Sequence, residues 1–164
     1  MNNNAIFVDK NDNFIKYGNR NDLNKGDIIR ISTLWLENSN GEVLLARRSD
    51  DKKYDPGKWG MAATGTLEPD ETYESNVYKE AEEEIGITEV TFTPVCKEIF
   101  IRQDGVGRAC YIYKAIVNKP AKEFILQESE VAEVKWFTKA EIRELIQKSP
   151  DMLVGSYISW EKLL

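Results

Sequence analysis

The chain has 164 residues, 41% of them hydrophobic and 30% charged, with a net charge of −6. This length suits one globular domain with a substantial core, and we expect residues 1–164 to form a single domain. The acidic balance argues against an extended nucleic-acid surface, because such surfaces need many Lys and Arg side chains to neutralise phosphates.

An N-terminal hairpin extension is expected over residues 1–26. Two short apolar runs, at residues 6–9 and 14–17, flank the turn-rich segment Lys10-Asn-Asp-Asn13. We predict that this hairpin is an appendage on the core.

A second hairpin is predicted by the strand-like runs 28–36 and 42–48, which Asn38-Ser-Asn-Gly41 joins with a strong turn signal. Residues 49–58 contain a Pro-Gly turn and no periodic apolar pattern, so they are expected to form an exposed loop. A short strand at residues 59–64 should follow.

A helix is predicted to begin near residues 69–72 and to end at Gly86, a residue type favoured just past a helix end. Its apolar stripe, Val77, Ala81 and Ile85 with Tyr78 alongside, should face the sheet.

The rest of the chain alternates strand patterns with one more helix. Thr138 and Glu141 form a capping box that opens this helix, which should run to about Lys148. The alternation predicts an α/β fold, a mixed sheet packed between helices as an α/β/α sandwich. The other expected elements are strands at 90–95, 97–102, 109–117 and 131–137, a hairpin tip at 104–107, and a short helix within 151–164.

Three carboxylates stand out on the first helix. Glu80, Glu83 and Glu84 are spaced i, i+3 and i+4, which puts them on one side of the helix. Such like charges destabilise an isolated helix by roughly 0.2 to 0.5 kcal/mol per pair, and a hard divalent cation would reverse that effect. A solvated acidic face is the alternative interpretation. Zinc is disfavoured, because the chain has no histidine and Cys96 and Cys110 are far apart in sequence.

The flanking residues extend this pattern over residues 65–87. Gly65 is followed after five residues by Glu71, after seven more by Lys79-Glu80, and then by Glu83-Glu84 and Gly86. The segment resembles the Nudix box, in which arginine stands at the position of Lys79 and a larger aliphatic residue at Ala81. Guanidinium is a planar fork that can brace two carboxylates, whereas ammonium is a point charge.

The resemblance implies a Nudix-type fold and hydrolysis of a nucleoside diphosphate-type substrate, a small molecule, with Mg²⁺ or Mn²⁺. It implies that Glu83 and Glu84 are metal ligands and that Glu80 is a ligand or general base. Glu71 matches the supporting glutamate, and Lys79 would orient the carboxylates. We count these five residues as the catalytic set.

Further site residues are expected outside the box. Arg47, Arg48 and Lys58, with Lys52 and Lys53, are candidates for the substrate's phosphates, and Trp59, Tyr54 and Trp35 for stacking on a base. Glu128, Glu130 and Glu98 are candidates for an additional acid. A solvated surface or a place in the core is the competing account of each group.

Arg47-Arg48, the 54–59 segment and the N-terminal hairpin resemble the branch of Nudix proteins related to isopentenyl diphosphate isomerase. That isomerase needs a cysteine before the box glycine and a histidine-rich metal site, whereas this chain has Thr64 and no histidine. A hydrolase is therefore favoured over an isomerase. A Nudix-fold nucleotide-binding sensor without turnover is the other alternative, with Lys79 as its main support.

No apolar run approaches the roughly 18 residues of a membrane span, and the first residues lack the apolar stretch of a signal peptide. We therefore expect a cytoplasmic protein without a membrane partner. Both cysteines are expected to be reduced, partly buried thiols. The sequence leaves a homodimer open.

Overall fold

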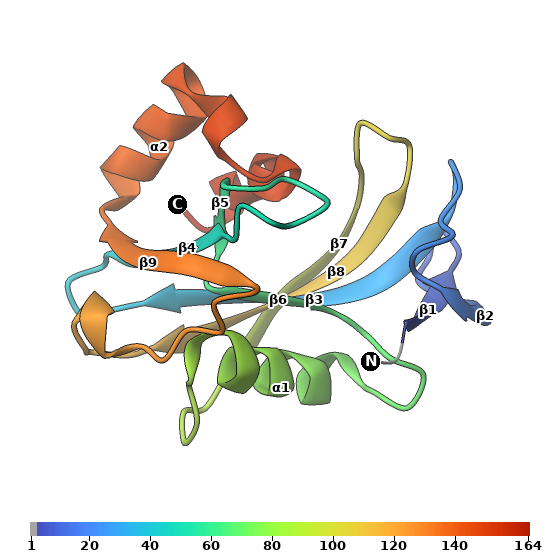
Figure 1. The fold of residues 1–164 in the computed structure, drawn as a ribbon, viewed down its shortest axis with the longest axis horizontal. Helices are drawn as coiled ribbons and strands as arrows, with labels where there is room; N and C mark the ends of the chain where they lie inside the picture. The colour runs from blue at the N-terminus through green and yellow to red at the C-terminus, as the bar shows by residue number, and fades with distance from the viewer. Residues whose placement is uncertain (1–2) are drawn as a thin grey trace.

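A computed structural model describes residues 3–164, apart from the side chains of residues 156–159. The described residues form a nine-stranded mixed sheet with two α-helices and three short 3-10 helices (Figure 1). The strands are β1 (Asn4–Val8), β2 (Phe14–Asn19), β3 (Ile28–Glu37), β4 (Val43–Arg48), β5 (Trp59–Met61), β6 (Ala63–Thr66), β7 (Thr93–Ile101), β8 (Gly107–Ile116) and β9 (Val131–Phe137). The helices are α1 (Tyr73–Ile85), η1 (Ala121–Glu123), α2 (Lys139–Lys148), η2 (Pro150–Met152) and η3 (Gly155–Lys162).

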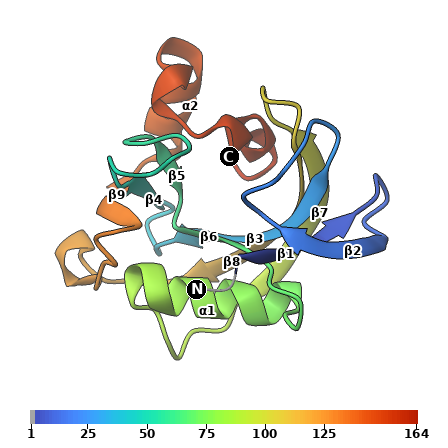
Figure 2. The same ribbon diagram turned by 45° about the vertical axis from the view of Figure 1, so that its right-hand side comes forward.

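Strand β3 organises the sheet. It pairs in parallel with β8 along its whole length, antiparallel with β6 through residues 31–34, and with β4 only at its last two residues. Strands β5 and β9 both pair antiparallel with β4, and β7 pairs antiparallel with β8. The β1–β2 hairpin lies at the end of the sheet away from β9 and α2 (Figures 1 and 2). Both predicted hairpins are therefore confirmed.

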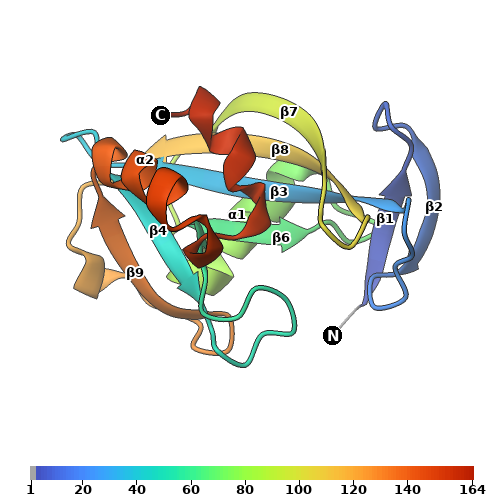
Figure 3. The same cartoon turned by 90° about the horizontal axis from the view of Figure 1, so that it is seen from above.

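The sheet lies between helices, as the alternation of elements predicts. Helix α1 covers one face, and α2 with the C-terminal 3-10 helices covers the other (Figures 1 and 3). Consecutive residues of a strand point to opposite faces, so Leu34 and Leu36 join the core under α1, whereas Trp35 joins the core under α2. No helix in the described part of the chain combines the length and apolarity that crossing a bilayer requires.

Two predicted segments differ from the structure. The expected strands 90–95 and 97–102 are one strand, β7, with an irregularity between Pro94 and Cys96, because the long strand β8 pairs with it throughout. The expected strand 59–64 is two strands, since β5 pairs with β4 and β6 pairs with β3. A chain that passes from one partner to the other must break its pairing near Ala62.

Candidate active site

Helix α1 is fixed at both ends by its own sequence. The Thr72 hydroxyl accepts a hydrogen bond from the Ser75 N–H, and the Ser75 hydroxyl accepts one from the Thr72 N–H, so the two residues form a capping box. The helix ends at Gly86, whose left-handed φ of 66° lets its N–H reach the Glu82 carbonyl. The predicted stripe of Val77, Ala81 and Ile85 is buried against the sheet. These features hold the glutamates of α1 at the edge of that buried stripe.

Strand β6 passes very close to α1. A Cβ atom on Gly65 would lie 2.1 Å from the Glu80 Cγ and 2.3 Å from its Oε1. Any other residue at position 65 would therefore displace the Glu80 carboxylate. Gly65 and Glu80, which both belong to the predicted pattern, therefore lie in close contact.

Glu71 and Lys79 form a brace beside Glu80. The Lys79 ammonium lies 2.5 Å from Glu71 Oε1 and 3.9 Å from Glu80 Oε1. Burial alone would raise the pKa of Glu71, but hydrogen bonds from Lys79, the Glu68 N–H and Asn76 outweigh it and lower that pKa. Lys79 thus lies between the two carboxylates, where the bracing role predicts it.

No sequence pattern predicted a role for Asn76, although it is fully buried and central to this brace. Its Nδ2 donates to Glu71 Oε2 at 2.8 Å and to Glu80 Oε1 at 3.4 Å, and its Oδ1 accepts from the Ser32 hydroxyl at 2.6 Å. A polar residue next to the apolar stripe and one turn before Glu80 was the available signal. We regard Asn76 as a positioning residue for both glutamates.

Glu84 and Glu80 are carboxylates in unfavourable surroundings. Burial raises the pKa of Glu84 to about 8, the negative charge of Glu80 adds to this, and the Thr64 N–H, which donates to Glu84 Oε2 at 3.0 Å, opposes it. Burial also raises the pKa of Glu80 to about 7, opposed by Lys79 and reinforced by Glu83. The pKa values of both glutamates therefore lie near neutral, because burial outweighs the nearby positive charge.

This donor set suits a hard divalent cation. Oxygen ligands are what Mg²⁺ prefers, and a cation would favour the ionised form of both carboxylates, which burial disfavours. Glu83 is exposed on the same side of α1 as Glu80. Among the described residues, no three acidic or cysteine side chains already converge in ligating geometry. The carboxylates are neighbours that would have to turn toward a shared ion.

The other predicted site residues are mostly engaged in contacts of their own. Their contacts are as follows: Arg47 with Asp50 and Glu133, Arg48 with the Tyr54 carbonyl, Lys58 with Asp55, Lys52 with Glu130, and Glu98 with Lys162. Trp59 and Trp35 are 8% and 1% exposed and belong to the core, which leaves little of either ring for a base. Glu128 is exposed. Glu130 and Arg48 are close enough to Glu84 to affect its pKa.

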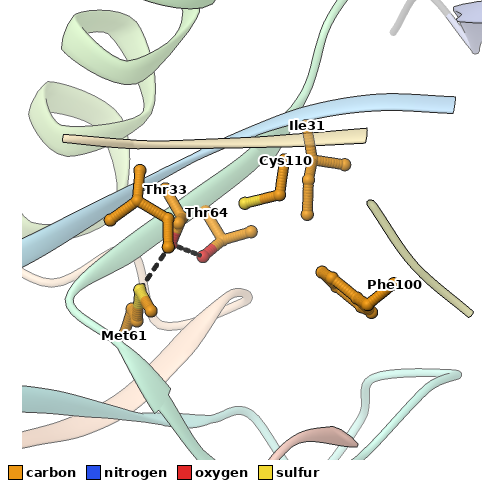
Figure 4. Close-up of a pocket in the computed structure, with 7 residues that line it drawn as sticks. Ile31, Thr33, Met61, Thr64, Phe100 and Cys110 are labelled. Carbon is orange, nitrogen blue, oxygen red and sulfur yellow. Dashed lines mark hydrogen bonds between the residues drawn. The ribbon is translucent and has the colours of Figure 1, made fainter. Parts of the chain in front are cut away.

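A small pocket lies on the opposite face of the sheet, next to the same edge of β6 (Figure 4). Its volume is about 20 Å³, and it is lined by Ile31, Thr33, Met61, Thr64, Phe100, Cys110 and Ile112. The hydroxyls of Thr33 and Thr64 lie 2.6 Å apart at one end. Thr64 therefore belongs to both regions, because its side chain lines the pocket while its N–H holds Glu84.

Comparisons with known proteins identify relatives of this chain. A family model described as "NUDIX domain" matches residues 28–154. The chain is 32% identical over 126 residues to the "Uncharacterized Nudix hydrolase YfcD" of Salmonella typhi, covering 76% of this chain and 66% of the relative, just under two thirds of that protein's length.

It is also 30% identical over 145 residues to the "Prenyl-diphosphate phosphatase" of Methanosarcina mazei, covering 87% of this chain and 84% of the relative. Among solved structures, DR0079 from Deinococcus radiodurans superposes with a TM-score of 0.78 at 19% identity, covering 95% of this chain and 94% of that one. At that identity the superposition shows a shared fold.

Proposed function

Because this chain belongs to the NUDIX domain family, we propose that it is a hydrolase that uses Mg²⁺ or Mn²⁺ to cleave a pyrophosphate linkage in a nucleoside diphosphate-type small molecule. The observation that carries this proposal is the pairing of Gly65 with Glu80, which brings a partly buried carboxylate against the edge of β6. Glu84 reaches the same edge through the Thr64 N–H.

Each residue of the box has a physical task in this proposal. Glu80, Glu83 and Glu84 would hold the cation, and the Glu71–Lys79 pair would keep Glu80 in place. The chemistry that a divalent cation supplies is neutralisation of phosphoryl charge and a lower pKa for a water molecule. With its pKa raised to about 7, Glu80 is also suited to accept a proton near neutral pH.

The test is hydrolysis of a panel of diphosphate compounds by the purified protein, with and without Mg²⁺. Glu83→Gln should abolish metal-dependent product release while leaving the fold intact, because the side chain is exposed and the change is nearly isosteric. Glu82→Gln is the matched control, since Glu82 is exposed on the same turn but outside the predicted ligand set. Undiminished turnover by the Glu83 variant would refute the proposal.

A prenyl diphosphate is a second candidate substrate. The pocket beside Thr64 is lined mainly by apolar side chains, and one relative is named as a prenyl-diphosphate phosphatase. The panel should therefore include geranyl diphosphate beside the nucleotides. Faster hydrolysis of the prenyl compound would select this candidate.

Kinship with the isopentenyl diphosphate isomerase branch stays a prediction. Isomerase chemistry is disfavoured, because position 64 offers a hydroxyl that already pairs with Thr33. The sensor alternative rests on Lys79, and tight binding of a panel compound without any product would favour it.

A further inference from the structure

Arg108 lies on the face of the sheet that carries the pocket. Residues of β8 alternate between faces, so Arg108 shares a face with Cys110 and Ile112, which both line the pocket. On the neighbouring strand, Arg108 pairs with Phe100, another lining residue. The half-buried guanidinium therefore continues the pocket surface toward the start of β8.

Within the described residues, Arg108 has no carboxylate partner. In the described part of the chain its guanidinium makes one hydrogen bond, from Nη1 to the carbonyl of its neighbour Gly107 at 3.0 Å. Arg30, Arg47 and Arg102 on nearby elements each lie within 4.0 Å of an aspartate or glutamate. Burial lowers the pKa of Arg108 to about 10, the positive charge of Arg102 adds to this effect, and the negative charge of Asp104 opposes it. A half-buried cation without a direct ion pair is unfavourable, and an anionic ligand would relieve it.

The exposed loop 49–58 reaches across to the β7–β8 hairpin near this cation. The Arg102 guanidinium lies 4.9 Å from the centre of the Tyr54 ring, and its Nη2 lies 4.0 Å from Asp55 Oδ2. Among the described residues, Arg102 therefore lies within 4.0 Å of a carboxylate, whereas Arg108 does not.

Arg108 is separated from the carboxylates by the pocket. Thr33 pairs with Thr64 and with Ile112, whereas Ile29, four residues earlier on β3, pairs with Arg108. Four residues of strand span about 13 Å. A diphosphate group held at the Thr64 end is too short to reach a guanidinium that is bonded to Gly107.

We propose that Arg108 binds a second phosphate of the substrate, so that the preferred substrates are diphosphate compounds with an additional phosphate on the organic part. The inference rests on the proposed function for the diphosphate. It predicts that a compound with an apolar end is a poorer substrate than one with a phosphorylated end.

The binding site can be tested without turnover. Inorganic phosphate is titrated in EDTA while the Nε–Hε signals of ¹⁵N-labelled arginine side chains are followed by NMR, with Arg108→Lys used to assign the Arg108 signal. The Arg108 signal should shift and saturate, while the signal of Arg47, which is already paired with Asp50 and Glu133, should move little. An unmoved Arg108 signal, or equal drift of both signals, would overturn the proposal.

Selectivity gives a second test. NADPH and NADH share a diphosphate and differ by one ribose phosphate, and their affinities can be measured in EDTA by nicotinamide fluorescence. Wild type should prefer NADPH, and Arg108→Gln should raise the Kd for NADPH about tenfold with little effect on NADH, since a hydrogen bond to a charged group is lost. Lys122→Gln, an equal charge change at an exposed side chain, should alter neither affinity.

No preference in wild type, or equal losses for both compounds, would refute the role of Arg108. If no compound is hydrolysed but the Arg108 response persists, the proposed function fails and this site stands. Metal-dependent turnover without any Arg108 response would refute this site and leave the proposed function standing.

Discussion

Glu80 and its neighbours illustrate what the residue scale adds to the sequence. The i, i+3, i+4 spacing correctly predicts which side of α1 carries the carboxylates. It could not predict that Asn76 would join Glu71 to Glu80, or that the Thr64 N–H would hold Glu84, because strand β6 and Ser32 of β3 complete these contacts. Arg108 was likewise not predicted, since a lone arginine in a strand carries no motif.

Gly65→Ala should reduce kcat by tenfold or more with little loss of stability. The new Cβ would displace the flexible end of Glu80 rather than backbone, so the cost should lie below the roughly 1 to 3 kcal/mol typical of overpacking. Gly155→Ala is the control, because a Cβ there meets nothing within 4 Å. Steady-state kinetics and thermal melting would check this, and full activity in Gly65→Ala would contradict it.

Lys79→Arg should retain or increase activity. The ammonium already contacts Glu71 and Glu80, and a guanidinium could donate to both carboxylates at once. The measurement is kcat/KM at saturating Mg²⁺. A large loss would show that the brace is built around an ammonium.

At the scale of elements, short sequence signals predict where a helix begins and ends better than they predict which strands pair. The predicted capping box at Thr138 and the predicted helix end at Gly86 depend only on nearby residues, and the structure has both. The capping box at Thr72 was not predicted, because Ser75 stands where the sequence signal expects Glu or Gln. The division of 59–64 into β5 and β6, and the fusion of 90–102 into β7, depend on which strand lies alongside, and that information is distant in sequence.

Gly86→Ala should destabilise the protein more than Gly41→Ala. Both glycines have positive φ, 66° and 77°, which costs an alanine about 1 to 2 kcal/mol. A Cβ on Gly86 would also lie 2.8 Å from the Ile125 Cβ, whereas Gly41 has open space. Urea unfolding of both variants would measure the difference. Equal losses would show that the segment around Ile125 shifts freely.

At the scale of the whole molecule, a network around the buried Glu37 side chain ties two strands and a helix together. Glu37 at the end of β3 accepts a hydrogen bond from Trp35 Nε1 at 2.8 Å, and its carboxylate lies 2.9 Å from Lys114 Nζ on β8 and 3.1 Å from Lys139 Nζ on α2. The sequence predicted strands and helices here but not this junction, because only the assembled layers bring the groups together.

Glu37 should stabilise the fold above pH 4.5 and lose that effect in acid. Burial alone would raise its pKa, but Lys114, Trp35 and Lys139 lower it below the ordinary 4.5. A carboxylate with a lowered folded-state pKa contributes its full stability above the unfolded-state value and loses it as pH falls through the folded-state value.

Glu37→Gln should therefore cost about 1 to 3 kcal/mol at pH 7, with a smaller cost at about pH 3.5. Urea unfolding of wild type and variant at both pH values would check this prediction. A cost independent of pH would show that the charge of Glu37 contributes nothing.

Neighbouring residues on β3 serve opposite sides of the molecule. Ser32 bonds to Asn76 under α1, whereas Thr33 bonds to Thr64 beside the pocket. Since side chains alternate along a strand, inserting one residue before Ser32 would exchange the two faces. The support of the carboxylates and the wall of the pocket would then be lost together. Insertions should therefore be tolerated in the loops around β3 far more easily than within the strand itself.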